Sequence, residues 1–361
     1  MNASISAVSI GGGHRQKLAV VGAGAIGRRH VDAIIQSNDA ELFCIVDPTD
    51  AAMDYAKALD VPWFPDLSSM FQAAAPDGIV LATPNRFHVE QGLSCIAAAI
   101  PVLIEKPIGT DVRSAAALVE AAEKADVPLL VGHHRRHNPL IQAVKDRLAA
   151  GTIGTIVAVH GMFWAYKPDN YFDVPWRRQP GSGPIFTNFI HDVDLMRWLC
   201  GEIETVQALE SNSVRGNLVE DTAAILLRFD NGALGTITIS DTIVSPWSWE
   251  MTSGENPAYP AADESCYLIG GTHGSLEIPK LRLWSNAATR SWFEPFHQDA
   301  VPFEIGDPLI RQITHFARVI RREEPPLVSG RGALKTLAVI EAVKRSARTG
   351  QAVHLTQQAG G

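Results

Sequence analysis

The sequence predicts an α/β fold in which a parallel sheet is followed by a second α/β unit built on a large, mostly antiparallel open sheet. Three observations support this prediction. Helical and strand patterns alternate over the first third of the chain, which is typical of a parallel sheet with helices on both faces. From about residue 134 the pattern changes to alternating, β-branched stretches separated by turns. At 361 residues, 46% of them hydrophobic, the chain is long enough for two domains.

The first elements surround a glycine-rich turn. Residues 17–21 form an apolar run that predicts a buried strand, and this run leads directly into GAGAIG at 22–27. In such a GxGxxG pattern the glycines allow a tight turn, a close approach of phosphate to the backbone, and close packing of the next helix. The helix predicted over 25–36 would direct its first amides at the phosphates. These features predict a dinucleotide-binding Rossmann domain over 17–133, preceded by a flexible leader at 1–16.

A carboxylate follows the second strand of this domain. That strand is predicted over 42–46, and Asp47 comes where a carboxylate accepts hydrogen bonds from the ribose of a dinucleotide. Asp47 favours NAD over NADP, because it would repel a 2′-phosphate. Arg28 and Arg29 leave NADP open, since a guanidinium would accommodate that phosphate. Besides Asp47, the cofactor contacts predicted in this part of the chain are Gly22, Gly24, Ala25, Ile26 and Gly27.

Two further polar segments follow strands of the predicted parallel sheet. The strand over 78–82 precedes Thr83-Pro84-Asn85, and the strand over 102–104 precedes Glu105-Lys106-Pro107. Ligands of such sheets bind at the carboxyl ends of the strands, so we expect both segments at the cofactor. The remaining elements of this sheet are predicted over 50–59, 88–98, 111–125 and 127–131.

The second part of the chain, 134–361, is predicted to form the substrate-binding domain. The segment 186–199 has a helical apolar period that brings His191, Asp194 and Arg197 to one face. Asp230-Asn231-Gly232 is a hairpin signal between two strands. The strands are predicted at 155–163, 203–210, 222–229 and 233–240, and the other helices at 139–149, 308–322 and 332–348.

Composition excludes several classes of function. The formal net charge of -8 gives no electrostatic footprint for nucleic acid or an anionic membrane. No apolar stretch approaches the ~20 residues that span a bilayer, and the N-terminus lacks the pattern of a signal peptide. The four cysteines are far apart in the sequence, which predicts free thiols in a reducing cytoplasm.

The cluster His133, His134 and His137 does not predict a metal site. Its spacing matches no zinc-ligand pattern, and Arg135 and Arg136 would repel a cation. We therefore expect no metal. Some of these side chains are expected in the cleft between the two domains, where Arg135 would meet an anionic group of the substrate.

A loop-like aromatic stretch suggests a sugar-binding surface. Trp164 and Trp176 belong to it, and Arg177 follows directly. Aromatic faces pack against the C–H surface of sugar rings, and arginine binds a carboxylate through two hydrogen bonds. Packing in the core is the alternative for each aromatic residue alone. The predicted substrate is therefore a polyhydroxylated ring, with or without an acid group.

Lys106 and His191 are the candidate catalytic residues. Oxidation of a secondary alcohol requires hydride transfer to nicotinamide and a base that removes the hydroxyl proton. A lysine can serve when burial and a neighbouring cation lower its pKa from about 10.4. In the reverse reaction the ammonium form returns the proton. His191 would orient the substrate hydroxyl or relay its proton.

Five segments together resemble the Gfo/Idh/MocA family of nicotinamide-dependent oxidoreductases, which includes glucose-fructose oxidoreductase and inositol dehydrogenases. The resemblance implies that Lys106 is the catalytic lysine, that Glu105 lies near the nicotinamide, that His88 belongs to a cofactor-binding turn, and that His191 is the catalytic histidine. It also implies a homodimer or homotetramer formed through the open sheet. The segments are GAGAIGRRH, ATPNRFHVE, IEKPIGTDV, GSGPIFTNFIHDVDLMRWLCG and SGRGALKTLAVIEAVKRSARTG.

The chain departs from this family at one position. Many members carry an aspartate four residues before the histidine, whereas this chain has Thr187, followed by Asn188. Threonine supplies no charge, so a Lys/Asp/His triad is absent. Either Lys106 and His191 suffice, with Thr187 or Asn188 holding the substrate by hydrogen bonds, or the reaction differs from simple dehydrogenation.

Three functions remain open from the sequence. The first is an NAD(P)-dependent dehydrogenase or reductase acting on a sugar, a cyclitol or a sugar acid. The second is a glycoside-cleaving or epimerising enzyme that oxidises and re-reduces its sugar with a retained NAD. The third is a cofactor-binding regulator without catalysis, against which the presence of Lys106 and His191 argues.

Overall fold

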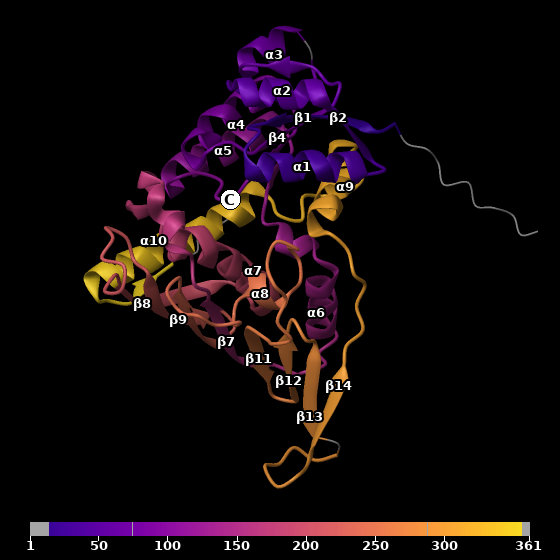
Figure 1. The fold of residues 1–361 in the computed structure, drawn as a ribbon. Helices are drawn as coiled ribbons and strands as arrows, with labels where there is room; N and C mark the ends of the chain where they lie inside the picture. Colours follow the sequence, from indigo (N-terminus) through magenta and orange to yellow (C-terminus); the bar gives the residue numbers. More distant parts are fainter. Residues whose placement is uncertain (1–13, 74, 287, 356–361) are drawn as a thin grey trace, which may run out of the picture.

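The computed structural model describes residues 14–73, 75–286 and 288–355 and contains two β-sheets (Figure 1). The predicted leader lies mostly outside the described residues, and Gln16 already belongs to the first strand. No helix in the described ranges has the length and apolar character needed to cross a membrane.

The first sheet has six parallel strands in the order β3-β2-β1-β4-β5-β6, as expected for a Rossmann domain. The two-residue strand β3 was not predicted. The peptide bond between Lys106 and Pro107, just after β5, is cis. The strands are β1 (Gln16–Val21), β2 (Ala40–Val46), β3 (Trp63–Phe64), β4 (Gly78–Leu81), β5 (Val102–Ile104) and β6 (Leu129–Val131).

Helices cover both faces of this sheet. Successive residues of a strand face opposite sides, so each strand contributes to two buried clusters. In β1, Ala19 and Val21 belong to one buried cluster, and Leu18 and Val20 to another. The turn Asn85–Phe87 is a short 3₁₀ helix. The helices of this part are α1 (Ala25–Gln36), α2 (Asp50–Ala58), α3 (Leu67–Ala73), α4 (His88–Ala97) and α5 (Val112–Ala125).

The second sheet has nine strands in the order β14-β13-β12-β11-β7-β10-β9-β8-β15. Only the pairing of β7 with β10 is parallel among those the structure describes. Figure 1 shows it running from β8 to the protruding strands β13 and β14. The strands are β7 (Ile156–Trp164), β8 (Ile203–Ser211), β9 (Thr222–Phe229), β10 (Leu234–Ser240), β11 (Tyr267–Gly271), β12 (Gly274–Ile278), β13 (Arg282–Asn286), β14 (Phe296–Ala300) and β15 (Val353–His354).

Helices pack on one face of the second sheet and leave the other face open. The helix predicted over 186–199 is in fact a π-helical turn, Ile185–Phe189, continued by α7 (Ile190–Cys200). The other helices here are α6 (Pro139–Ala149) and the short α8 (Trp249–Thr252), with 3₁₀ turns at His134–His137, Asp169–Asp173 and Pro175–Arg178.

The last two helices return to the first sheet, so the chain does not divide cleanly at residue 133. Helix α9 (Pro308–Ile320) packs on α1 and buries Ile313 and Phe316 in the core of that sheet. Helix α10 (Gly330–Thr349) contacts α5 on one side and both α7 and β8 on the other. The two units are therefore joined by shared helices as well as by the connection before α6.

Candidate active site

The glycine-rich turn is tightly packed at two glycines and open at the third. Gly22 has φ +93°, and a Cβ there would lie 2.7 Å from the Ala82 carbonyl oxygen. A Cβ on Gly27 would lie 1.8 Å from the Gly22 carbonyl oxygen, so this glycine lets α1 approach β1. A Cβ on Gly24 would meet nothing within 4 Å. The turn thus has the open backbone that a pyrophosphate requires.

Asp47 lies at the end of β2 beside this turn, where Ala25 and Ile26 begin α1. Its Oδ2 accepts a hydrogen bond from the Ala23 amide at 2.9 Å, and its Oδ1 accepts from the Thr49 amide at 3.0 Å. Burial opposes the charge of Asp47, but these hydrogen bonds outweigh it, so the pKa lies below its ordinary value. A charged carboxylate and the unpaired amides of a helix N-terminus therefore meet at one edge of the sheet, as predicted.

His88 joins the turns that follow β4 and β5. Its Nδ1 lies 2.7 Å from the Pro107 carbonyl oxygen and its Nε2 lies 2.8 Å from the Thr83 carbonyl oxygen. The Thr83 hydroxyl donates to Gln91 Oε1 at 2.6 Å, and Asn85 is exposed on the 3₁₀ turn. Both ring nitrogens of His88 face backbone carbonyl oxygens, so this side chain positions the two turns, and its contact with a cofactor stays a prediction.

Glu105 is fixed between α1 and the turn that carries Lys106. Its Oε1 lies 2.7 Å from His30 Nε2, and its Oε2 accepts from the Lys106 amide at 3.1 Å. A Cβ on Gly132 would lie 2.9 Å from Oε1, so this glycine leaves room for the carboxylate. Burial opposes the charge of Glu105, but the His30 hydrogen bond and nearby positive charges lower its pKa to about 2. His30 and Gly132 were not predicted to support the site.

Lys106 reaches from the end of β5 to the π-helical turn. Its Nζ donates to the Thr187 carbonyl oxygen at 3.0 Å. Burial is the main cause that lowers the pKa of Lys106, and the charge of Lys167 acts in the same direction, while Glu105 and Glu250 oppose it. The structure thus provides the desolvated amine that the sequence predicted.

His191 lies in the first turn of α7, four residues after Thr187, and is 8% exposed. Its ring packs edge-on against His134, with ring centres 5.4 Å apart. Burial lowers the pKa of His191 well below its ordinary value, and the charges of Lys106 and Arg135 act the same way. Its Nδ1 is buried without a hydrogen-bond partner in the described part of the chain. A neutral imidazole and Lys106 therefore share one site.

A second lysine lies in this site and was missed by the sequence prediction. Lys167, in the loop after β7, donates from Nζ to Asn188 Oδ1 at 2.9 Å and lies 3.4 Å from Thr187 Oγ1. An Asp241 carboxylate oxygen lies 3.7 Å from the same amine. Burial lowers the pKa of Lys167, and Asp241 opposes this shift. Thr187 and Asn188 therefore hold a second amine near Lys106. The only sequence signal was its position after a predicted strand, beside the aromatic stretch.

Arg135 does not face an open substrate site. It is 3% exposed, and its guanidinium donates to Asp192 Oδ1 at 2.7 Å and to Glu250 Oε1 at 2.9 Å. The Tyr267 hydroxyl lies 3.1 Å away. Two carboxylates neutralise this buried charge, which argues against the prediction that Arg135 binds a substrate anion. Burial raises the pKa of the Asp192 carboxyl to about 6.

Trp164 faces away from the site. Along β7 it alternates with the buried Phe163, and its indole N–H donates to the Thr238 hydroxyl at 3.0 Å on the open face of the second sheet. Helix α7 packs on the other face of that sheet, with Tyr267 of β11 reaching Asp192. The predicted contact of Trp164 with substrate is therefore wrong, because strand alternation places it on the opposite side from His191.

Trp176 and Arg177 lie on a 3₁₀ turn at the border of the site. Trp176 is 56% exposed. Arg177 donates to the Tyr171 carbonyl oxygen at 2.8 Å, and its guanidinium stacks 4.0 Å from the centre of the Tyr171 ring. The Lys167 amine lies 5.3 Å from the same ring. Arg177 is thus connected to the site through Tyr171.

Of the histidines next to Arg135, His134 has a hydrogen-bond partner, whereas both ring nitrogens of His137 and Nδ1 of His133 are buried without one among the described residues. His134 Nε2 lies 2.7 Å from Glu255 Oε1, and the rings of His137 and His315 are centred 5.3 Å apart. Over the described ranges, no three or more histidine, cysteine, aspartate or glutamate side chains are grouped as they would be around a metal ion.

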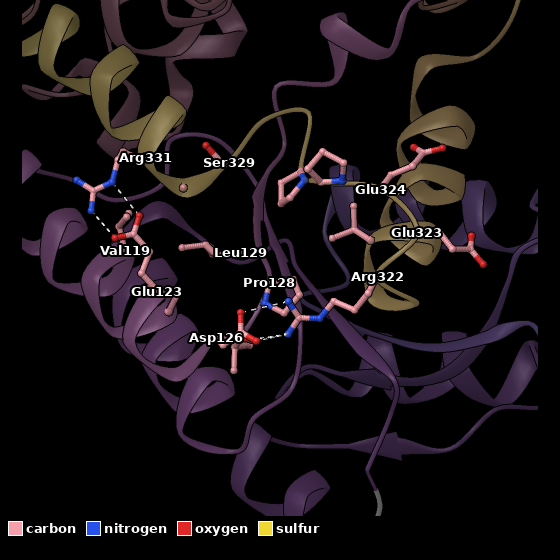
Figure 2. Close-up of a pocket in the computed structure, with 16 residues that line it drawn as sticks. Val119, Glu123, Asp126, Pro128, Leu129, Arg322, Glu323, Glu324, Ser329 and Arg331 are labelled. Carbon is pink, nitrogen blue, oxygen red and sulfur yellow. Dashed lines mark hydrogen bonds and ion pairs between the residues drawn. The ribbon is translucent and has the colours of Figure 1, made fainter. Parts of the chain in front are cut away.

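A pocket of about 480 Å³ lies elsewhere, between α5, the start of β6 and the segment before α10 (Figure 2). Ion pairs of Arg322 with Asp126 and of Arg331 with Glu123 border it. The strand β6 begins here, so the pocket lies at the amino ends of the strands, opposite the edge that carries Lys106. It is not part of the site of Lys106 and His191.

Comparison with known proteins identifies the family. Residues 16–133 match the model of an oxidoreductase family with an NAD-binding Rossmann fold, and residues 141–277 match the GFO/IDH/MocA C-terminal domain. The rhizopine catabolism protein MocA of Rhizobium meliloti is 28% identical over 232 residues, which is 62% of this chain and 71% of that protein. The myo-inositol 2-dehydrogenase of Thermotoga maritima is 26% identical over 95% of this chain and 100% of its own.

A solved structure is similar to this chain over nearly its whole length. The WlbA dehydrogenase of Bordetella pertussis, in complex with NADH and UDP-GlcNAcA, aligns with a TM-score of 0.77 and 28% identity, covering 96% of this chain and 100% of its own. The models of both domains of one family therefore match this chain in the expected order, and the chain has the Rossmann sheet described above. The chain belongs to the Gfo/Idh/MocA family and is an NAD-binding oxidoreductase.

Proposed function

We propose that this enzyme transfers hydride between NAD and a secondary alcohol of a sugar, a cyclitol or a sugar acid. The observation that carries the proposal is the contact of Lys106 Nζ with the Thr187 carbonyl oxygen, four residues before the buried His191. When bound, the nicotinamide supplies the hydride acceptor or donor. The chain supplies the groups that bind the alcohol and exchange its proton.

Lys106 is the general base in oxidation and the general acid in reduction. Its lowered pKa supports this role, because a neutral amine is then more populated near neutral pH than in an ordinary lysine. His191 assists as a neutral imidazole, and its unpartnered Nδ1 supports a hydrogen bond with the substrate hydroxyl. The protein therefore needs no carboxylate at position 187 to remove the proton.

We assign the cofactor to the edge of the first sheet. Its pyrophosphate would be held by Gly22, Gly24, Ala25, Ile26 and Gly27. The rest of the dinucleotide would contact Thr83, Asn85 and Glu105. Asp47 would accept hydrogen bonds from the ribose, which favours NAD over NADP. Arg28 leaves NADP open, because its guanidinium, which stacks 4.0 Å from the Tyr55 ring centre, is exposed and its charge acts on Asp47.

The substrate class follows from the second amine. A carboxylate on the sugar would pair with Lys167, while Trp176 and Arg177 would border the ring. Two relatives support the choice of class: one is named for a cyclitol, myo-inositol, and the other was solved with UDP-GlcNAcA. We therefore propose a sugar or cyclitol site in which Thr187 and Asn188 hold Lys167 for an acid group.

Residues 17–133 are proposed to bind NAD, and residues 134–361 to bind substrate and form a homodimer or homotetramer. The open face of the second sheet supports self-association, because Leu209, Leu226 and Leu234 project from adjacent strands and are 69%, 53% and 52% exposed. The four unpaired, buried cysteines support a reducing compartment, for which we propose the cytoplasm.

The proposal is tested by a panel of sugars, cyclitols and sugar acids with NAD and NADP in parallel. Formation of reduced nicotinamide, measured by its absorbance, is the expected result, with NAD preferred. Chromatographic detection of product without any net absorbance change would instead indicate the cycle of oxidation and re-reduction on a retained cofactor. Tight NADH binding without conversion of any member of the panel would contradict the proposed reaction.

A further inference from the structure

Glu250, in the short helix α8, has a carboxylate of which only one oxygen is bound. Its Oε1 accepts a hydrogen bond from Arg135 at 2.9 Å. Its Oε2 is buried and has no hydrogen-bond partner among the described residues. Buried polar atoms in folded proteins nearly always have partners. This oxygen therefore marks a place where a donor is expected.

Glu250 is linked to the active site through its charge and through Arg135. The charge of Glu250 opposes the lowering of the pKa of both Lys106 and Lys167, which burial causes. Its anchor Arg135 also binds Asp192, the residue that follows His191. The charged or titratable groups around Lys106 are Glu105, Glu250, Arg135, Lys167, His133 and His191.

A second carboxylate, Glu255 in the loop after α8, provides a contrast. Glu255 Oε1 lies 2.7 Å from His134, and its Oε2 accepts from Asn138 at 2.9 Å and from Trp249 at 3.1 Å. Both oxygens of Glu255 are thus used inside the protein. Of these two partly buried carboxylates, only Glu250 has an oxygen left for a ligand.

We propose that Glu250 is a substrate-binding residue whose Oε2 accepts a hydrogen bond from a hydroxyl of the bound polyol. The inference rests on the proposed function, because it needs a polyhydroxylated substrate beside Lys106. One hydroxyl contacts the lysine amine and a second contacts the carboxylate, so the site recognises a diol and not a lone alcohol. A hydrogen bond from a hydroxyl to a charged carboxylate is a strong one.

The test compares Glu250→Gln with Glu255→Gln as the matched control. Glutamine at 250 keeps an oxygen for Arg135 but replaces the free acceptor by an amide donor. With a substrate found in the panel, Glu250→Gln is expected to raise KM by about 10-fold or more without changing the Kd for NADH. It should also remove the preference for that substrate over its deoxy analogue. Glu255→Gln is expected to lower thermal stability without changing this preference.

A measurement that needs no turnover separates this inference from the proposed function. Limiting acetic anhydride labels the apo protein at a series of pH values, and mass spectrometry follows acetylation of Lys106. Loss of the negative charge at 250 lowers the pKa of Lys106, so the labelling midpoint should fall by about half a pH unit or more in Glu250→Gln and stay in place in Glu255→Gln. In the wild type, myo-inositol or D-glucuronate should protect Lys106 from labelling, and this protection should weaken in Glu250→Gln.

An unmoved midpoint together with unchanged protection would overturn the role of Glu250, even if the enzyme proves to be a polyol dehydrogenase. An unchanged KM and an unchanged preference over the deoxy analogue would do the same. If the wild type binds NADH but converts no member of the panel, the proposed function fails, and the labelling arm alone decides whether Glu250 faces Lys106 and contacts a polyol.

Discussion

Lys106 and Lys167 lie in one site but have different partners. Lys106 Nζ contacts a neutral carbonyl oxygen, whereas Lys167 lies 3.7 Å from the Asp241 carboxylate. Asp241 also pairs with Arg215 at 2.7 Å, so one carboxylate serves two cations. An amine without a directly bound counter-ion loses its proton more readily than a paired one. Lys106 is therefore suited to proton transfer, and Lys167 to binding an anion.

Replacement of Lys106 by alanine is expected to lower kcat by about 10²-fold or more, the scale for loss of a general acid/base. The Kd for NADH, measured by fluorescence titration, should change little, because the glycine-rich turn and Asp47 remain. Lys106→Arg is the control, since arginine keeps the charge but does not release its proton. Full activity in either variant would remove Lys106 from the mechanism.

The pH dependence of the reaction should report the lowered pKa of Lys106. Oxidation needs the neutral amine, so kcat/KM for oxidation should rise with pH and level off above the pKa of Lys106. Because burial lowers that pKa, the midpoint should fall below the ordinary lysine value of 10.5. Reduction needs the ammonium form and should decline over the same pH range. A rate of oxidation that falls through this range would contradict the assignment.

Lys167→Met tests whether the second amine selects an acid group. Methionine keeps much of the length of the side chain without its charge. A charge-assisted hydrogen bond contributes about 1.5–3 kcal/mol, so KM for a uronate should rise by about 10-fold or more. KM for the matching neutral sugar should change far less. Equal losses for both substrates would indicate that Lys167 only supports the fold of its loop.

At the scale of elements, the π-helical turn before α7 is decisive for the site. The sequence predicted one continuous helix over 186–199, and the apolar period indeed fits one. The turn Ile185–Phe189 is held by tertiary contacts, including the hydrogen bond that the Ile185 amide donates to Glu220 Oε1 at 3.0 Å. Local sequence contains no signal of that distant partner. The position of the Thr187 carbonyl oxygen therefore could not be predicted.

The two glycines of the cofactor turn should respond differently to the same added methyl group. In Gly24→Ala the new Cβ meets no protein atom, so the thermal midpoint should change little while NADH binds about 10-fold or more weakly. In Gly27→Ala the Cβ would lie 1.8 Å from the Gly22 carbonyl oxygen, and the fold should lose about 1–3 kcal/mol of stability. Calorimetry and fluorescence titration of both variants check this. Equal stability of the two would contradict the packing described for the turn.

At the scale of the whole molecule, the first sheet was predictable and much of the second was not. Long apolar runs, the glycine turn and the alternation with helices identified β1, β2, β4, β5 and β6. Strands β11 to β14 are short, contain Gly270, Gly271 and Gly274, and end in the exposed strand Phe296–Ala300, so their pattern is weak. The return of α9 and α10 to the first sheet depends on long-range packing. The local periodicity of the sequence does not predict such packing.

The open face of the second sheet is expected to form the contact between subunits. Leu209, Leu226 and Leu234 form a diagonal row across β8, β9 and β10, in which Leu226 pairs with Gln207 and Thr236, and each leucine is more than half exposed. Burial of such a patch between two copies stabilises a dimer in proportion to the apolar area removed from water. The double variant Leu209→Lys/Leu226→Lys should therefore be a monomer when the wild type is a dimer or tetramer.

Sedimentation velocity measures the mass of each variant. The control is Trp292→Lys, which changes an exposed aromatic residue in the loop between β13 and β14. Helix and strand content by circular dichroism should be unchanged in the double variant, because both leucines face away from the core. A monomeric wild type, or an assembly that survives two lysines on this face, would place the interface on another surface.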